Sequence, residues 1–350
     1  MNQRRTSYLL VIAIAVVGAA LLFINRSGGD VAGKPLANFA IEDTAAIDKI
    51  FIVDTDQNQI LLRRDPNSRY WDLNDTLKAR WDAVELLLKT FKRIKVKAPV
   101  PAEARENVIR LLAGAGKKVE IYQGGDKPSK TYIVGNATQD HTGTYMLLET
   151  AEAGRSSEPF IVHMEGFTGF LSTRFFTDVN EWRYTGVFDF PNLEFNKVEA
   201  VHHFNPLSSF TVTYNGGNDL ALYDANNRLS PTFDTLAVKD FLLLFKRAHI
   251  ETYKSYLTAQ QEDSLRATSP AYTFRVTTNS GELRELMLYR KPKVSDIYDE
   301  AGNVDPWDQA RMYSQCFGEI GLAQLFVFTP MVSTTYQGLI NGERQINPYK

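Results

Sequence analysis

An uncharged run of 17 residues, Tyr8–Ile24, constrains this chain more than any other feature of its sequence. A helix rises about 1.5 Å per residue, so the run covers roughly 26 Å of a hydrocarbon core that is about 30 Å thick. Arg5 precedes the run and Arg26 follows it, and such side chains reach the headgroups at either end. We therefore predict a transmembrane anchor over residues 8–24.

A cleaved signal peptide is the alternative interpretation, with Val17-Gly18-Ala19 as a small-residue cleavage site. The apolar run continues past that site to Ile24, which favours the uncleaved anchor. The tail, residues 1–7, is basic and has no acidic residue, so the positive-inside tendency predicts a cytoplasmic N-terminus and a translocated body. Ala15 and Ala19 lie four residues apart and suit helix–helix packing in the membrane.

The charge of the body argues against nucleic acid as a partner. The chain has a net charge of −2, and its first 26 residues hold three arginines and no acid, so the remainder carries about −5. Binding to nucleic acid requires a clustered basic surface. Cys316 is the only cysteine, which excludes an intrachain disulfide and a thiolate metal site, and we expect it to be a buried core residue.

The sequence of the body predicts two copies of the same structural unit. Residues 25–38 are rich in glycine and polar residues and are predicted to be a linker, followed by domains over residues 39–183 and 184–350. A helical apolar stripe in the first domain recurs in the second with an offset of 154 residues. The stripes consist of Val84, Leu87, Leu88 and Phe91, and of Val238, Phe241, Leu242 and Phe245.

Matching strand predictions surround these two helices. The hairpin 47–53/59–64 is equated with 210–214/219–223, and a later hairpin 118–122/131–134 with 272–277/283–289. The remaining strands at 144–148 and 160–163 are equated with 311–315 and 325–328. The predicted fold class is α+β: a transmembrane helix followed by two tandem, duplicated antiparallel α+β domains.

No catalytic constellation emerges from the sequence. It contains no nucleophile elbow, phosphate-binding loop or dinucleotide fingerprint, and we predict a protein without enzymatic activity, cofactor or bound metal. The acidic segment from Asp296 to Asp305 has oxygens that suit calcium, but its spacing does not match an EF-hand loop. Candidate partner contacts on the body are Asp140, His141, Asp296, Asp299 and Asp305.

Several packing and turn motifs in the body resemble a family of bacterial membrane-anchored proteins defined only as a domain of unknown function. The resemblance extends over residues 36–345. It is carried by the segments Tyr70-Trp71-Asp72-Leu73, Ala79-Arg80-Trp81-Asp82-Ala83-Val84, Tyr132-Ile133-Val134-Gly135, Tyr145-Met146-Leu147-Leu148, Glu181-Trp182-Arg183, Phe188-Asp189-Phe190 and Phe195-Asn196-Lys197-Val198.

Members of that family tend to be encoded beside ABC-type transporter components and an auxiliary protein of gliding motility. The resemblance thus implies a single-pass inner-membrane protein with a periplasmic body. The expected function is that of an accessory subunit of a cell-envelope ABC-type transport complex. The expected partners are integral membrane proteins, such as the permease or its auxiliary subunit, and membrane lipid around the anchor. The alternative is a module that binds an envelope polymer or an exported substrate through aromatic side chains in a groove between the domains.

Overall fold

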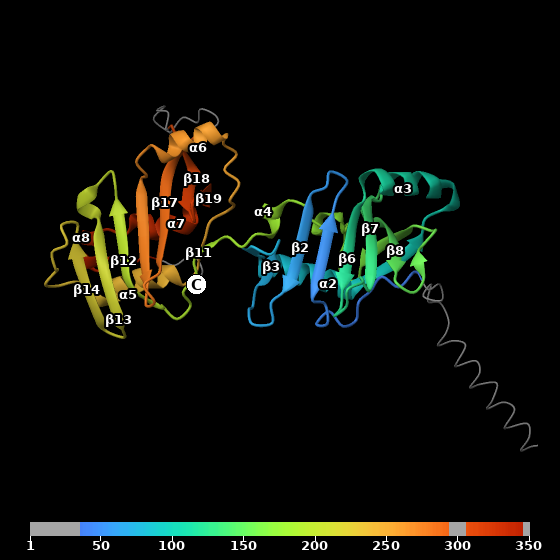
Figure 1. The fold of residues 1–350 in the computed structure, drawn as a ribbon. Helices are drawn as coiled ribbons and strands as arrows, with labels where there is room; N and C mark the ends of the chain where they lie inside the picture. The colour runs from blue at the N-terminus through green and yellow to red at the C-terminus, as the bar shows by residue number, and fades with distance from the viewer. Residues whose placement is uncertain (1–35, 294–305, 346–350) are drawn as a thin grey trace, which may run out of the picture. The chain divides into compact units, whose positions relative to one another are not determined.

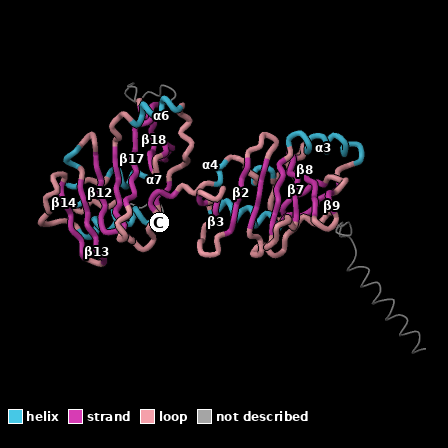
Figure 2. The backbone as a smooth tube through the Cα atoms, viewed as in Figure 1, coloured by secondary structure: helices cyan, strands magenta, loops and turns pink. Residues whose placement is uncertain are grey.

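The computed structural model of the protein describes residues 36–293 and 306–345, which form two compact units that divide between Tyr184 and Thr185. Each unit has its own antiparallel sheet, helices and hydrophobic core (Figures 1 and 2), which confirms the predicted α+β class. None of the helices within these ranges is long and apolar enough to cross a bilayer. The predicted anchor, with Ala15 and Ala19, lies outside the described residues.

The sheet of the first unit has the strand order β4-β3-β2-β1-β6-β7-β8-β10-β5, and β9 pairs with β8. Its strands are β1 (Lys49–Val53), β2 (Gln59–Arg64), β3 (Trp71–Leu73), β4 (Leu77–Lys78), β5 (Ile94–Pro99), β6 (Lys117–Tyr122), β7 (Lys130–Ala137), β8 (Thr144–Thr150), β9 (Gly154–Arg155) and β10 (Phe160–Met164). Its helices are α2 (Trp81–Arg93), α3 (Ala102–Ala115), the 3-10 turn η2 (Ser172–Arg174) and α4 (Val179–Trp182).

Alternation along the strands places the two longer helices of this unit on opposite faces of the sheet. Met146 and Leu148 of β8 belong to the main core, which α2 covers with Leu87 and Phe91. Leu147, between them, belongs to a smaller cluster beneath α3. Successive side chains of a strand point to opposite faces, so the two helices sandwich the sheet.

The sheet of the second unit has the order β14-β13-β12-β16-β17-β18-β19. Its strands are β12 (Phe195–His202), β13 (Phe210–Gly216), β14 (Asp219–Asp224), β16 (Tyr272–Thr278), β17 (Leu283–Pro292), β18 (Trp307–Cys316) and β19 (Glu319–Gln324), and β11 (Gly186–Phe188) pairs separately with β15 (Ala248–His249). Its helices are α5 (Thr235–Leu243), α6 (Ala259–Arg266), α7 (Leu325–Ser333) and α8 (Tyr336–Asn341), with 3-10 turns η3 (Pro206–Ser208) and η4 (Leu244–Lys246).

The core of the second unit lies on one face of its sheet. Leu286 and Leu288 of β17 point into this core, where they meet apolar side chains of α5, η4, α7 and α8. Tyr289 therefore points to the other face, which is the face that α6 partly covers. Cys316 is buried in the core, as the sequence predicted.

Two predictions about these elements are wrong. The apolar run Leu325–Phe328, predicted as a strand, begins helix α7, because the place of the fourth strand is taken by β19 directly before it. Phe328 and Met331 of α7 pack against the sheet core, so tertiary packing overrides the β-propensity of this aromatic and β-branched run. Leu88 is only half-buried, whereas Leu87 is fully buried, because α2 turns the stripe of Val84, Leu87 and Phe91 to the sheet.

His202, at the end of β12, makes the stability of the second unit sensitive to pH. The ring is buried and hydrogen-bonds to the backbone of Thr334, while its Nε2 has no hydrogen-bond partner among the described residues. Burial lowers the pKa of His202 below its ordinary value of about 6.5, so the unfolded chain binds the proton more readily. This contribution to stability is full above about pH 6.5 and is lost as the pH falls toward the folded-state pKa.

Replacing His202 by asparagine should flatten this dependence, because the asparagine amide can replace the Nδ1 donor but does not titrate. We expect the urea midpoint of the second unit to fall less between pH 7 and pH 5 in the variant than in the unmodified chain. Hydrogen exchange at increasing urea measures that midpoint. Equal pH slopes in the two proteins would show that other groups carry the dependence.

Candidate binding groove

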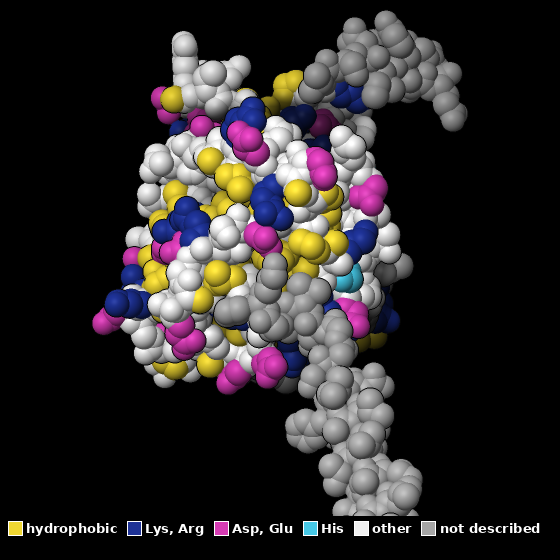
Figure 3. All heavy atoms as spheres, turned by 90° about the vertical axis from the view of Figure 1, so that its right-hand side faces the viewer, with side chains coloured by type: hydrophobic (Ala, Val, Ile, Leu, Met, Phe, Trp, Pro, Cys, Tyr) yellow, Lys and Arg dark blue, Asp and Glu magenta, His cyan; other side chains and the backbone are white. Residues whose placement is uncertain are grey.

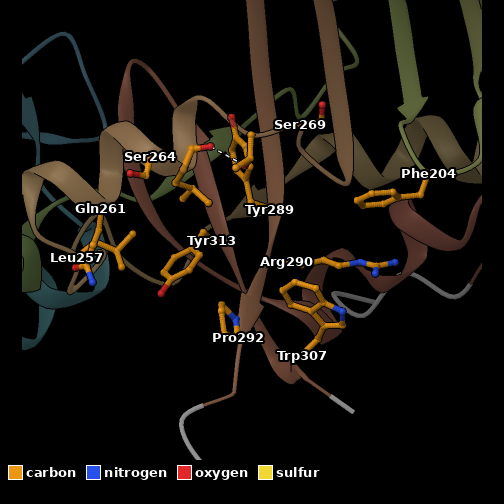
Figure 4. A pocket seen from close by; sticks show the side chains of 12 residues that line it. Phe204, Leu257, Gln261, Ser264, Ser269, Tyr289, Arg290, Pro292, Trp307 and Tyr313 are labelled. Atoms are coloured by element: carbon orange, nitrogen blue, oxygen red, sulfur yellow. Dashed lines mark hydrogen bonds between the residues drawn. The ribbon is translucent and has the colours of Figure 1, made fainter. Parts of the chain in front are cut away.

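A groove of about 510 Å³ lies within the second unit, beside the paired ends of β17 and β18 (Figure 4). It combines an exposed aromatic side chain, an aliphatic wall and one arginine. The residues that define it here are Phe204, Leu257, Tyr289, Arg290, Trp307 and Tyr313. They come from the turn after β12, the segment before α6, and strands β17 and β18.

The wall formed by α6 is held by its N-terminal cap. Thr258 and Gln261 form a capping box, which fixes where the helix starts and so places Leu257 beside the groove. Ser255 donates a hydrogen bond of 2.6 Å to Glu262, which ties the preceding segment to the same helix. These hydrogen bonds therefore hold the start of α6, and with it this wall of the groove, in place.

The register of β17 changes where the groove lies. Tyr289 pairs directly with Tyr313 of β18, and the register then shifts between Arg290 and Pro292. The pairing is regular up to Arg290, so the shift does not turn Arg290 itself. β16 pairs with β17 only as far as Leu288, so β17 continues beyond β16 from Tyr289 onward, and Tyr289 and Arg290 both line the groove there.

The guanidinium of Arg290 lies between two aromatic rings. Its Cζ is 4.5 Å from the ring centroid of Phe204 and 5.6 Å from that of Trp307 (Figure 4). Phe204 is 63% exposed although it is a large apolar residue, so one side of this stack faces solvent. Cation–π contacts of this type hold the guanidinium plane in a defined orientation.

Arg290 has no acidic partner within ion-pair distance in residues 36–293 and 306–345, whereas neighbouring cations are neutralised. A second hollow of about 630 Å³ shares Pro292 and Tyr313 with the groove. Along it, Arg311 pairs with Glu251 at 2.6 Å and Lys291 pairs with Asp308 at 2.7 Å. Burial alone would raise the pKa of Asp308, but hydrogen bonds, including that from Lys291, lower it instead.

The predicted contact residues Asp140 and His141 lie in a turn of the first unit, between β7 and β8. The carboxylate of Asp140 accepts hydrogen bonds from the hydroxyls of Thr138 and Thr142, both at 2.5 Å, and these bonds hold its pKa well below the usual range. The ring of His141 lies 5.7 Å from that of Phe170. Asp140 thus stabilises its own turn, while Asp296, Asp299 and Asp305 lie outside the described residues.

The surface has a mixed charge pattern. On the face drawn in Figure 3, acidic and basic side chains are interspersed with apolar ones, unlike the single-sign basic surface that binds nucleic acid. Within the described ranges, no three His, Cys, Asp or Glu side chains are placed to hold a metal ion. Glu165 pairs with Lys95 at 2.9 Å.

The sequence did not reveal the groove residues, because Phe204, Leu257, Arg290 and Trp307 come from four separate segments. The available signal was weak: two large aromatic residues stand in otherwise polar stretches, Phe204 before Asn205 and Trp307 before Asp308.

Comparison of the chain with models of known protein families and with curated protein sequences finds no match.

Proposed function

We propose that this protein is a membrane-anchored accessory subunit of a cell-envelope ABC-type transport complex and acts by protein–protein association. The observation that carries the proposal is the supported aromatic groove of the second unit, where Arg290, which has no ion pair among the described residues, lies between Phe204 and Trp307. Tryptophan, tyrosine and arginine are the residues that dominate the energetics of protein interfaces. A single groove contains all three of these residue types.

We also propose that the two units arose by duplication of one unit. Both sheets share a spatial order, with β3-β2-β1-β6-β7-β8-β10 in the first and β14-β13-β12-β16-β17-β18-β19 in the second. In each unit, three of these compared strands precede the first helix, and a second helix, α3 or α6, lies on the opposite face of the sheet. The shared strand order equates β1 with β12, whereas the sequence pattern equated β1 with the following strand, β13.

A second candidate function is binding of an exported substrate or envelope polymer. It is favoured by the polar side chains that accompany the apolar ones in the groove, among them Gln261, Ser264 and Ser269. In this form the alternative would use the aromatic side chains of the groove in the second unit, whereas the sequence led us to expect a groove between the domains.

A photo-crosslinking amino acid in place of Phe204 tests the proposed function in native membranes. We expect it to join the full-length chain to an integral membrane subunit of a transport complex, identified by mass spectrometry. The same substitution at Phe326 is the matched control, because that side chain is 65% exposed on α7 and does not line the groove. Equal yields of the same product from both positions, or no protein product from Phe204, would contradict the proposal.

A further inference from the structure

We infer that the groove binds a peptide segment of the partner that presents a large apolar side chain beside a carboxylate. The inference rests on the proposed function and specifies its ligand. Two features of the groove carry it, one electrostatic and one apolar. They lie side by side, because Arg290 and Tyr289 are consecutive and both line the groove.

The electrostatic feature is a positive charge left for a ligand. Lys291 and Arg311 are neutralised by Asp308 and Glu251, but Arg290 forms no ion pair among the described residues and stacks on two aromatic rings. A guanidinium presents a planar fork of donors that matches a carboxylate with two parallel hydrogen bonds. The flanking rings fix that fork before the ligand arrives, which reduces the entropy lost on binding.

The apolar feature is the wall opposite this stack. Leu257, Pro292 and Tyr313 come from three different segments, and the groove that they help to line has a volume of about 510 Å³, within the range of ordinary ligand sites. A large apolar side chain of the ligand would fill this space and exclude water from the neighbouring carboxylate–guanidinium pair. Excluding water strengthens such a pair.

A peptide fits these features better than a sugar or an acyl chain. The sides of Phe204 and Trp307 that face Arg290 are already occupied by its guanidinium, so those surfaces cannot stack on a sugar ring. The groove is also open to solvent and has polar side chains along it, such as Gln261 and Ser264, whereas an acyl chain requires an enclosed apolar channel. Those polar groups suit the backbone of a peptide.

Selection of displayed random linear peptides against the purified full-length chain tests the inference. We expect the selected peptides to share an aspartate or glutamate next to a large apolar residue. Fluorescence anisotropy should show binding weakened about tenfold or more by Arg290→Gln, because a charge-assisted pair is lost. Replacing the peptide carboxylate by its amide should weaken binding by the same factor. The two changes together should weaken binding little more than either change alone.

Arg284→Gln is the matched control. Arg284 lies on the same strand and also stacks on an aromatic ring, Phe317 at 5.4 Å, but it pairs with Glu282 and does not line the groove. This variant should bind the selected peptides as the unmodified chain does. Thermal midpoints of both variants should match that of the unmodified chain, because both arginines lie at the surface of β17.

The outcomes separate this inference from the proposed function. Selected peptides without an acidic residue, or with binding unchanged by Arg290→Gln, would overturn the inference while the crosslink from Phe204 could still stand. Failure to select any peptide would also overturn it, as would Arg290-dependent binding only to a polyuronate or to phosphatidylglycerol vesicles. Loss of the Phe204 crosslink to a membrane subunit would instead remove the proposed function.

Discussion

Replacing Phe245 by alanine should lower the free energy of unfolding of the second unit by roughly 3–5 kcal/mol. The side chain is fully buried, and its ring lies 5.0 Å from that of Phe188 and 5.2 Å from that of Phe241, both edge-on. It also contacts Phe195 and Phe274, which lie on different strands. A cavity at this position cannot be closed by moving a single neighbour, so the cost should fall at the upper end of that range.

Phe326→Ala is the control for this prediction, because Phe326 belongs to the same unit but is largely exposed. Its effect should stay within about 0.5 kcal/mol. Hydrogen exchange followed by mass spectrometry at increasing urea reports the two units separately, since peptides before and after Tyr184 are resolved. A loss of less than about 1 kcal/mol for Phe245→Ala would show that the cluster repacks.

Trp182→Ala should destabilise the first unit by roughly 3–5 kcal/mol, with a further cost for an unmade hydrogen bond. The indole is fully buried, packs edge-on against Phe176 at 5.6 Å, and donates a hydrogen bond of 3.0 Å to the carbonyl of the same residue. The backbone carbonyl of Trp182 also accepts a 2.6 Å hydrogen bond from the amide of Arg80. The variant therefore loosens the segment that closes this unit against the start of α2.

Trp81→Ala provides the matched comparison, because Trp81 opens α2 with 48% of its surface exposed. We expect this change to cost about 0.5 kcal/mol. The same exchange experiment should show faster exchange in the first unit of Trp182→Ala and unaltered exchange after Thr185. Equal effects of the two tryptophan substitutions would mean that the buried position contributes no more than the exposed one.

Sequence periodicity located elements that are strongly patterned and failed where tertiary packing decides the conformation. Helices α2 and α5 were predicted correctly from their apolar stripes, because one buried face dictates such a pattern, and β2 was predicted correctly as one arm of a hairpin. Helix α7 was mistaken for a strand, since a short apolar run fits either conformation until its neighbours are known. The order of the strands in each sheet could not be predicted from the sequence, because it depends on contacts between distant segments.

The candidate groove was less accessible to sequence reasoning than the fold. Arg290 resembles any other surface arginine until the fold brings Phe204 and Trp307 to it from two distant segments. Conversely, Asp140 stood out in a polar turn, yet its oxygens are occupied by Thr138 and Thr142. A polar residue that is conspicuous in the sequence can simply stabilise the turn that contains it. A residue that is inconspicuous in the sequence can line a groove because of the tertiary structure.

The position of β5 at the edge of the first sheet affects how the chain is made. This strand directly follows α2, but in the described sheet it pairs only with β10, whose first residue, Phe160, lies 61 residues after Pro99. At a synthesis rate of about 5–20 residues per second, β10 emerges roughly 3–12 s after β5. During that interval the backbone of the nascent strand has no partner in the finished arrangement, and an open strand edge is a template for mispairing. Ribosome-bound chains that stop before Phe160 should therefore be the species most in need of a chaperone.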